Sequence, residues 1–66
     1  MRISVNGEEV ETRVETNLAG WMEEQGIDVK AVLVEYNGRI TPEEEWTGII
    51  LQDGDRLELL QFVGGG

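Results

Sequence analysis

The 66-residue sequence contains no cysteine and no histidine, and it has a single proline and a single serine. The lack of cysteine excludes disulfides, thiolate metal ligands and a thiol nucleophile. The lack of histidine removes the side chain that titrates near neutrality, and with it Ser–His–Asp and Cys–His catalysis. We therefore predict that the chain is not an enzyme and that it binds neither a metal nor a cofactor.

The short chain and the lack of cysteine also indicate the size of the domain and its location in the cell. A domain of about 60 residues buries only roughly 60% of its unfolded surface, which leaves little room for an enclosed site. A secreted domain this small often needs disulfides, no basic start leads into a signal-like apolar run, and no stretch approaches the ~20 apolar residues of a membrane span. We expect one cytoplasmic domain over residues 1–63, a flexible glycine tail over 64–66, and a monomer when the protein is free.

Negative charge is abundant, because 14 acidic residues outnumber 5 basic ones and give a net charge of −9. Binding to nucleic acid relies on Lys and Arg at phosphates, so nucleic acid is not an expected partner. Anionic membrane surfaces are disfavoured for the same reason. The charge favours an electropositive protein partner, or it serves solubility alone.

The first half of the chain predicts a hairpin and a helix. Residues 2–6 alternate polar and apolar, Asn6-Gly7 is a strong turn signal, and residues 9–14 return as a polar edge strand. Thr16 or Asn17 is expected to cap a helix that ends at Gly26. Its apolar face is Leu18, Trp21 and Met22. Gly20 within the helix suggests a close approach of the helix to the sheet.

The second half predicts another hairpin and a last strand. Residues 31–36 form a strand with Val32, Val34 and Tyr36 toward the core, and Asn37-Gly38 turns into a short strand near Ile40. Thr41-Pro42-Glu43-Glu44 has the form of a capping box, so we expect Thr41 to cap a helical turn that ends near Trp46. Residues 49–51 are expected to re-enter the core, residues 53–55 to turn, and residues 56–63 to form the last strand.

This order of elements indicates an α+β fold of the β-grasp (ubiquitin-like) class. We expect a mixed sheet of four to five strands, with one main helix packed on one face and a short helical turn before the last strand. Trp21 and Trp46 are expected in the core. The run Glu43-Glu44-Glu45 lacks the ligand spacing of a calcium loop and suits a helix start instead.

Two features point to function. Leu57 and Leu59 share one face of the last strand, so Leu60 and Phe62 fall on the other, where Leu33 can join them. Exposed apolar residues at these three positions predict a partner-binding surface. The sequence then closes with Gly64, Gly65 and Gly66, a thin segment of about 10 Å that can thread into a narrow channel and deliver a terminal carboxylate.

The sequence resembles the ThiS-like sulfur-carrier proteins of thiamine biosynthesis, a branch of the ubiquitin-like β-grasp proteins. The resemblance covers the whole chain, and it rests on Asn6-Gly7, on VEYNGRITPEEEW (34–46), on LQDGDRLELLQF (51–62) and on Gly65-Gly66. The sequence departs from the family pattern at Gly64, where alanine or another small residue is common. It also departs at Glu43, where a basic residue is often found.

The resemblance implies that an ATP-dependent, E1-like adenylyltransferase (ThiF-like) activates the carboxylate of Gly66. Sulfur supplied through a cysteine desulfurase then converts it into a thiocarboxylate, which donates sulfur to a thiazole synthase (ThiG-like). Gly66 would carry the modification, while Gly64 and Gly65 would thread. Two alternatives stay open: the same mechanism in molybdopterin, cysteine, methionine or secondary-metabolite synthesis, and a β-grasp binding module that is not a carrier.

Overall fold

A computed structural model describes residues 1–13 and 15–61 of the chain. Its five strands lie in the order β2-β1-β5-β3-β4, so the last strand in sequence occupies the middle of the sheet. Strand β5 runs parallel to β1 and antiparallel to β3. The mixed five-stranded sheet confirms the predicted β-grasp arrangement. The strands are β1 (Arg2–Val5), β2 (Glu8–Glu11), β3 (Val32–Tyr36), β4 (Arg39–Ile40) and β5 (Arg56–Gln61).

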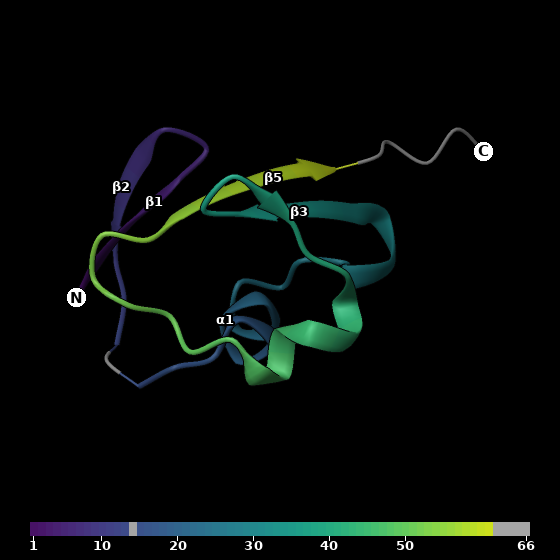
Figure 1. Cartoon of the computed structure of the whole chain (residues 1–66), viewed down its shortest axis with the longest axis horizontal. Coiled ribbons are helices and arrows are strands. Elements are labelled where there is room, and N and C mark those ends of the chain that lie inside the picture. Colours follow the sequence, from purple (N-terminus) through teal and green to yellow (C-terminus); the bar gives the residue numbers. More distant parts are fainter. Residues whose placement is uncertain (14, 62–66) are drawn as a thin grey trace.

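The helices lie together on one side of this sheet (Figure 1). They are the main helix α1 (Leu18–Glu24) and two 3₁₀ helices, η1 (Val29–Ala31) and η2 (Glu43–Gly48). The core between the helices and the sheet includes both tryptophans, as expected. Its buried members are Ile3, Leu18, Trp21, Met22, Val34, Trp46, Leu51 and Leu57.

Both hairpins turn through the predicted Asn-Gly pairs. Asn6 and Gly7 have φ of 51° and 85°, and Asn37 and Gly38 have φ of 50° and 87°. Positive φ at both central positions matches the right-handed twist of the flanking strands. Strand β2 lies at the edge of the sheet, as its polar sequence predicted.

Helix α1 is capped by Asn17, whose Oδ1 accepts a hydrogen bond from the backbone N–H of Gly20 at 2.6 Å. A Cβ on Gly20 would lie 3.0 Å from that same oxygen. The expectation that Gly20 marks a close approach to the sheet is therefore wrong. The glycine makes room for the cap, and it is exposed.

The predicted capping box at the start of η2 is also wrong. The residue at the cap position is Pro42, and no side chain caps the first turn. Thr41 is 2% exposed, and its hydroxyl lies 3.1 Å from the carbonyl oxygen of Arg39 and 3.4 Å from that of Val34. The hydroxyl donates inward toward these carbonyls, and its oxygen accepts no hydrogen bond from the first turn of η2.

Residues 49–51 were all expected in the core, and for Ile50 this expectation is wrong. Leu51 is buried, but Ile50 is 50% exposed. This segment is extended and pairs with the start of α1: the Leu18 N–H donates to the Ile49 carbonyl, and the Leu51 N–H donates to the Thr16 carbonyl. Side chains alternate along an extended backbone, so Ile50 points away from the core.

Candidate functional site

Strand β5 divides its side chains between the two faces of the sheet. Leu57 is 1% exposed beneath the helices, and Leu59 packs partly buried against the same core. Leu60 is 59% exposed on the opposite, open face. The predicted alternation is therefore confirmed for Leu57, Leu59 and Leu60. Phe62, the next residue predicted for this surface, lies outside the described residues.

Leu33 was expected to join this face from the neighbouring strand, and the register places it directly opposite Leu60. A shallow depression of about 400 Å³ lies beside this pair and is lined by Leu33, Glu35, Glu58, Leu59 and Leu60. We call it the Leu60 hollow. It joins exposed apolar surface to carboxylates in a domain of net charge −9.

A second row on the open face was not predicted. Glu35 lies opposite Glu58 on β5 and opposite Ile40 on β4, and Ile40 is 57% exposed. Ile40 therefore lies beside Glu35 on the neighbouring strand, and Leu60 lies two residues beyond Glu58 on the same strand. The alternation along each strand indicates which residues face outward, but the pairing of Glu35 with Glu58 depends on the register between strands.

Strand β5 is held by the two turn asparagines. The Asn6 N–H donates to the carbonyl oxygen of Leu57 at 2.9 Å, and the Asn6 Oδ1 accepts from the N–H of Leu59 at 2.7 Å. Asn37 forms two similar hydrogen bonds with Arg56. Its N–H donates to the Arg56 carbonyl oxygen at 2.8 Å, and its Oδ1 accepts from the Arg56 N–H at 2.7 Å. Each carboxamide thereby extends the hydrogen bonding of β5 beyond the neighbouring strand and helps to fix the strand that carries the site.

Asp55 anchors the start of β5 from a position that is 8% exposed. Its carboxylate accepts hydrogen bonds from the Tyr36 hydroxyl at 2.7 Å, the Asn37 Nδ2 at 3.1 Å and the Gln52 N–H at 2.8 Å. Partial burial, followed by the hydrogen bond and negative charge of Asp55, raises the pKa of Tyr36 to about 12. The Asp-Gly-Asp segment forms a turn, as predicted, with Gly54 at a φ of 89°. Asp55 is in addition the centre of a polar cluster.

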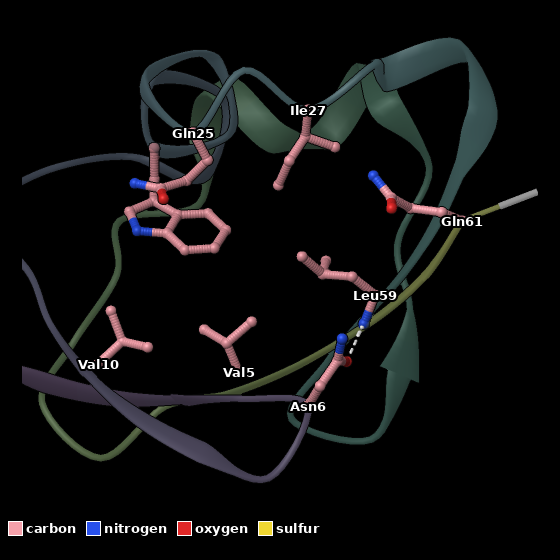
Figure 2. Close-up of a pocket in the computed structure, with 8 residues that line it drawn as sticks. Val5, Asn6, Val10, Gln25, Ile27, Leu59 and Gln61 are labelled. Atoms are coloured by element: carbon pink, nitrogen blue, oxygen red, sulfur yellow. Dashed lines mark hydrogen bonds between the residues drawn. The ribbon is translucent and has the colours of Figure 1, made fainter.

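A second, apolar groove opens on the helix side of the sheet. Figure 2 shows Val5, Ile27 and Leu59 pointing into it, with Gln25 and Gln61 at its edges. Its volume is about 360 Å³, and its lining residues are Val5, Asn6, Val10, Trp21, Gln25, Ile27, Leu59 and Gln61. The groove is lined by the first hairpin, by α1 and the residues after it, and by β5.

The acidic run Glu43-Glu44-Glu45 occupies the first turn of η2, where Glu45 pairs with Arg39. Within residues 1–13 and 15–61, no three acidic side chains gather closely enough to hold a metal ion. None of the helices in the described part is long and apolar enough to cross a membrane. The tail residues Gly64, Gly65 and Gly66 lie outside the described residues.

A helix held against a mixed sheet with β5 at its centre, and an open face that carries apolar residues, define a ubiquitin-like β-grasp domain. Residues 3–66 match the ThiS family, and the chain belongs to that family. It is similar to the crystal structure of a thiamine biosynthesis protein (ThiS) from Geobacter metallireducens, with a TM-score of 0.85, 29% identity and full coverage of both chains. An NMR structure of a thiamine biosynthesis protein from the same organism matches with a TM-score of 0.81 and 30% identity, over the whole of this chain and 88% of the other.

Curated relatives add a second kind of similarity. The chain is 35% identical over its full length to part of a thiazole synthase from Paramagnetospirillum magneticum, and 32% identical to part of one from Magnetococcus marinus. In both cases it spans about a fifth (20%) of the relative's length. It is also 29% identical to the uncharacterized protein ycf40 of Trieres chinensis, over 94% of this chain and 85% of that protein.

Proposed function

We propose that the protein is a sulfur carrier for the thiazole of thiamine, and that the carboxylate of Gly66 is the group that carries sulfur. The observation that carries the proposal is membership of the ThiS family over residues 3–66. It is supported by the similarity, over the whole chain, to a structure described as a thiamine biosynthesis protein. Gly64 and Gly65 would form the thin segment that threads the carboxylate into a partner's active site.

The chemistry begins with a carboxylate, which is a poor acyl donor until it is activated. A ThiF-like adenylyltransferase would join an oxygen of the Gly66 carboxylate to the α-phosphorus of ATP and release pyrophosphate. Hydrosulfide would attack the acyl carbon and expel AMP, which leaves the thiocarboxylate. A persulfide would attack in the same way to give an acyl disulfide, which a thiol would then reduce to the thiocarboxylate. The chain itself contains no cysteine or histidine, so the enzymes and the cysteine desulfurase would supply these catalytic groups.

Thiazole synthesis is the destination that the relatives favour. Two proteins named thiazole synthase each contain a segment similar to this chain. A ThiG-like thiazole synthase would therefore receive the sulfur from the Gly66 thiocarboxylate. In these steps the protein is a carrier that enzymes act on, and it is not an enzyme itself.

The open sheet face would dock the partners. Leu60 is 59% exposed and lies opposite Leu33, and burial of such surface is the main favourable term in most protein associations. Phe62 is proposed to extend the same surface.

Intact-mass spectrometry tests the carrier function. The protein is incubated with a ThiF-like adenylyltransferase, ATP and sulfide, and the expected product is heavier by the difference between sulfur and oxygen. Fragmentation should place the increase on Gly66, and a variant without Gly66 is the control. An unchanged mass with a cognate adenylyltransferase, or an increase that persists in the control, would contradict the proposal.

A further inference from the structure

The central pair of antiparallel strands places two like charges side by side. Glu35 on β3 lies directly opposite Glu58 on β5, on the face that also exposes Leu60. Like charges directly opposite each other in a sheet are destabilising. A domain this small has little stability to spare, so the pair calls for an explanation.

Within residues 1–13 and 15–61, neither Glu35 nor Glu58 forms an ion pair with a basic group within 4.0 Å. The ion pairs of this part of the chain join Arg2 to Glu9 and Glu11, Arg13 to Glu24, Arg39 to Glu45 and the N-terminal ammonium to Glu11. Arg56 precedes Glu58 by two residues on the same strand, yet no ion pair between them is among these contacts. The two carboxylates therefore face outward without a basic partner among residues 1–13 and 15–61.

The surface around the two carboxylates is both apolar and concave. Leu33, Leu60 and the carboxylates line the same hollow of about 400 Å³. Ile40 lies beyond Glu35 on β4 and is 57% exposed. Arginine and lysine bury aliphatic stems along apolar surface while their heads keep polar contacts, so both halves of such a side chain match what the hollow offers.

We propose that the Leu60 hollow receives a basic side chain from the surface of a partner protein. Its aliphatic stem packs on Leu33 and Leu60, and its cationic head lies between Glu35 and Glu58. Arginine fits best, because its planar guanidinium can contact two carboxylates at once. The identification of this partner as the adenylyltransferase rests on the proposed function. The charge and shape of the hollow are independent of it.

The proposal predicts opposite effects on stability and on binding. In Glu35→Gln, in Glu58→Gln and in the double variant, the repulsion is removed, so the melting temperature of the free protein should rise. The same changes remove the charges that meet the partner's cation. Affinity for the purified ThiF-like adenylyltransferase, measured by titration calorimetry, should fall about tenfold or more for the double variant, since a hydrogen bond to a charged group contributes more than a neutral one.

Glu44→Gln is the matched control. It removes one negative charge from η2, on the helix side of the sheet, and should leave the affinity nearly unchanged. Equal weakening by Glu44→Gln and by the single variants Glu35→Gln and Glu58→Gln, which remove the same charge, would mean that only net charge matters, and it would overturn the proposal. A double variant that binds like the wild type, a lower melting temperature in that variant, or a wild type without measurable affinity for the adenylyltransferase would overturn it as well.

Mass spectrometry of the same variants separates this proposal from the carrier function. With saturating adenylyltransferase, ATP and sulfide, the Gln variants should still gain sulfur, because Gly66 is intact. If the wild type gains sulfur but the variants bind normally, the hollow proposal fails and the carrier function stands. If the variants bind weakly as expected but no protein gains sulfur, the carrier function fails and the hollow proposal stands.

Discussion

The two turn asparagines look equivalent in sequence, but their side chains have different partners. The Asn6 Oδ1 accepts a hydrogen bond from Leu59. Asn37 accepts one from Arg56 and also donates through its Nδ2 to the carboxylate of Asp55, at 3.1 Å. Replacement by aspartate preserves an acceptor at both positions, but at position 37 it also sets a second carboxylate against Asp55.

We therefore expect Asn37→Asp to lower the free energy of unfolding by about 1–3 kcal/mol, the scale for a buried polar group that loses its partner. Asn6→Asp should have a much smaller effect. Urea denaturation at neutral pH measures both. Equal losses for the two variants would contradict the assigned role of Asp55.

Tyr36 is a second hydrogen-bond donor to Asp55, and its replacement tests the same polar cluster. Its hydroxyl donates to Asp55 at 2.7 Å, so Tyr36→Phe should destabilise the protein by about 0.5–1.5 kcal/mol near neutral pH. The pKa of Tyr36 is raised from 10.0 to about 12. Above pH 10 the unfolded chain loses this proton while the folded protein retains it, so the free energy of unfolding falls until the pH passes the folded pKa.

Tyr36→Phe cannot lose that proton. The stability difference between wild type and variant should therefore be largest below pH 10 and should shrink between pH 10 and about 12. Chemical denaturation of both proteins across this range measures it. A difference that stays constant with pH would show that the hydroxyl does not hold its proton more tightly in the folded protein.

At the scale of elements, the start of α1 shows a conflict between helix propensity and capping. Alanine is favoured over glycine in a helix by about 1 kcal/mol, yet a Cβ on Gly20 would lie 3.0 Å from the capping oxygen of Asn17. We expect Gly20→Ala to give no net stabilisation. In an Asn17→Gly background, where the oxygen is absent, the same change should stabilise by up to about 1 kcal/mol.

A double-mutant cycle by thermal and urea unfolding tests this coupling. Asn17→Gly alone should cost only a few tenths of a kcal/mol, because glycine is an acceptable cap. If Gly20→Ala stabilises both backgrounds equally, the two residues are independent and the crowding at the cap has no energetic effect.

The elements also show which features the sequence could predict. Asn-Gly turns, the apolar face of α1 and the alternation along β5 depend on neighbouring residues, and all three were predicted correctly. Thr41 was assigned wrongly because the carbonyls that engage it, those of Val34 and Arg39, are brought to it by the second hairpin. Local sequence specified a cap, and tertiary contacts overrode it.

In the candidate site, too, the features set by neighbouring residues could be predicted and those set by tertiary contacts could not. Leu33 and Leu60 could be assigned to the open face, because side-chain direction alternates along each strand. The opposition of Glu35 and Glu58 could not be predicted, because it requires the register between strands that are more than 20 positions apart in the sequence. The shape of the hollow likewise depends on that register.

At the scale of the whole molecule, the excess of 14 acidic over 5 basic residues should make stability depend on salt. Screening weakens repulsion between exposed charges, with a Debye length that shrinks to about 8 Å at physiological ionic strength. We expect the melting temperature of the free protein to rise from low salt to ~0.15 M NaCl. Tetramethylammonium chloride at equal ionic strength should give the same rise, because screening does not depend on which monovalent cation is present.

The salt response should be smaller in the Glu35→Gln, Glu58→Gln double variant, because the like charges that lie opposite each other on β3 and β5 are gone. Binding to a basic partner should respond in the opposite direction and weaken as salt is added, since screening also reduces attraction. Melting curves and calorimetric titrations over one series of salt concentrations measure both responses. A melting temperature that falls with salt would mean that the attractive pairs at Arg2, Arg13 and Arg39 outweigh the repulsion. The acidic surface would then contribute to the stability of the domain rather than reduce it.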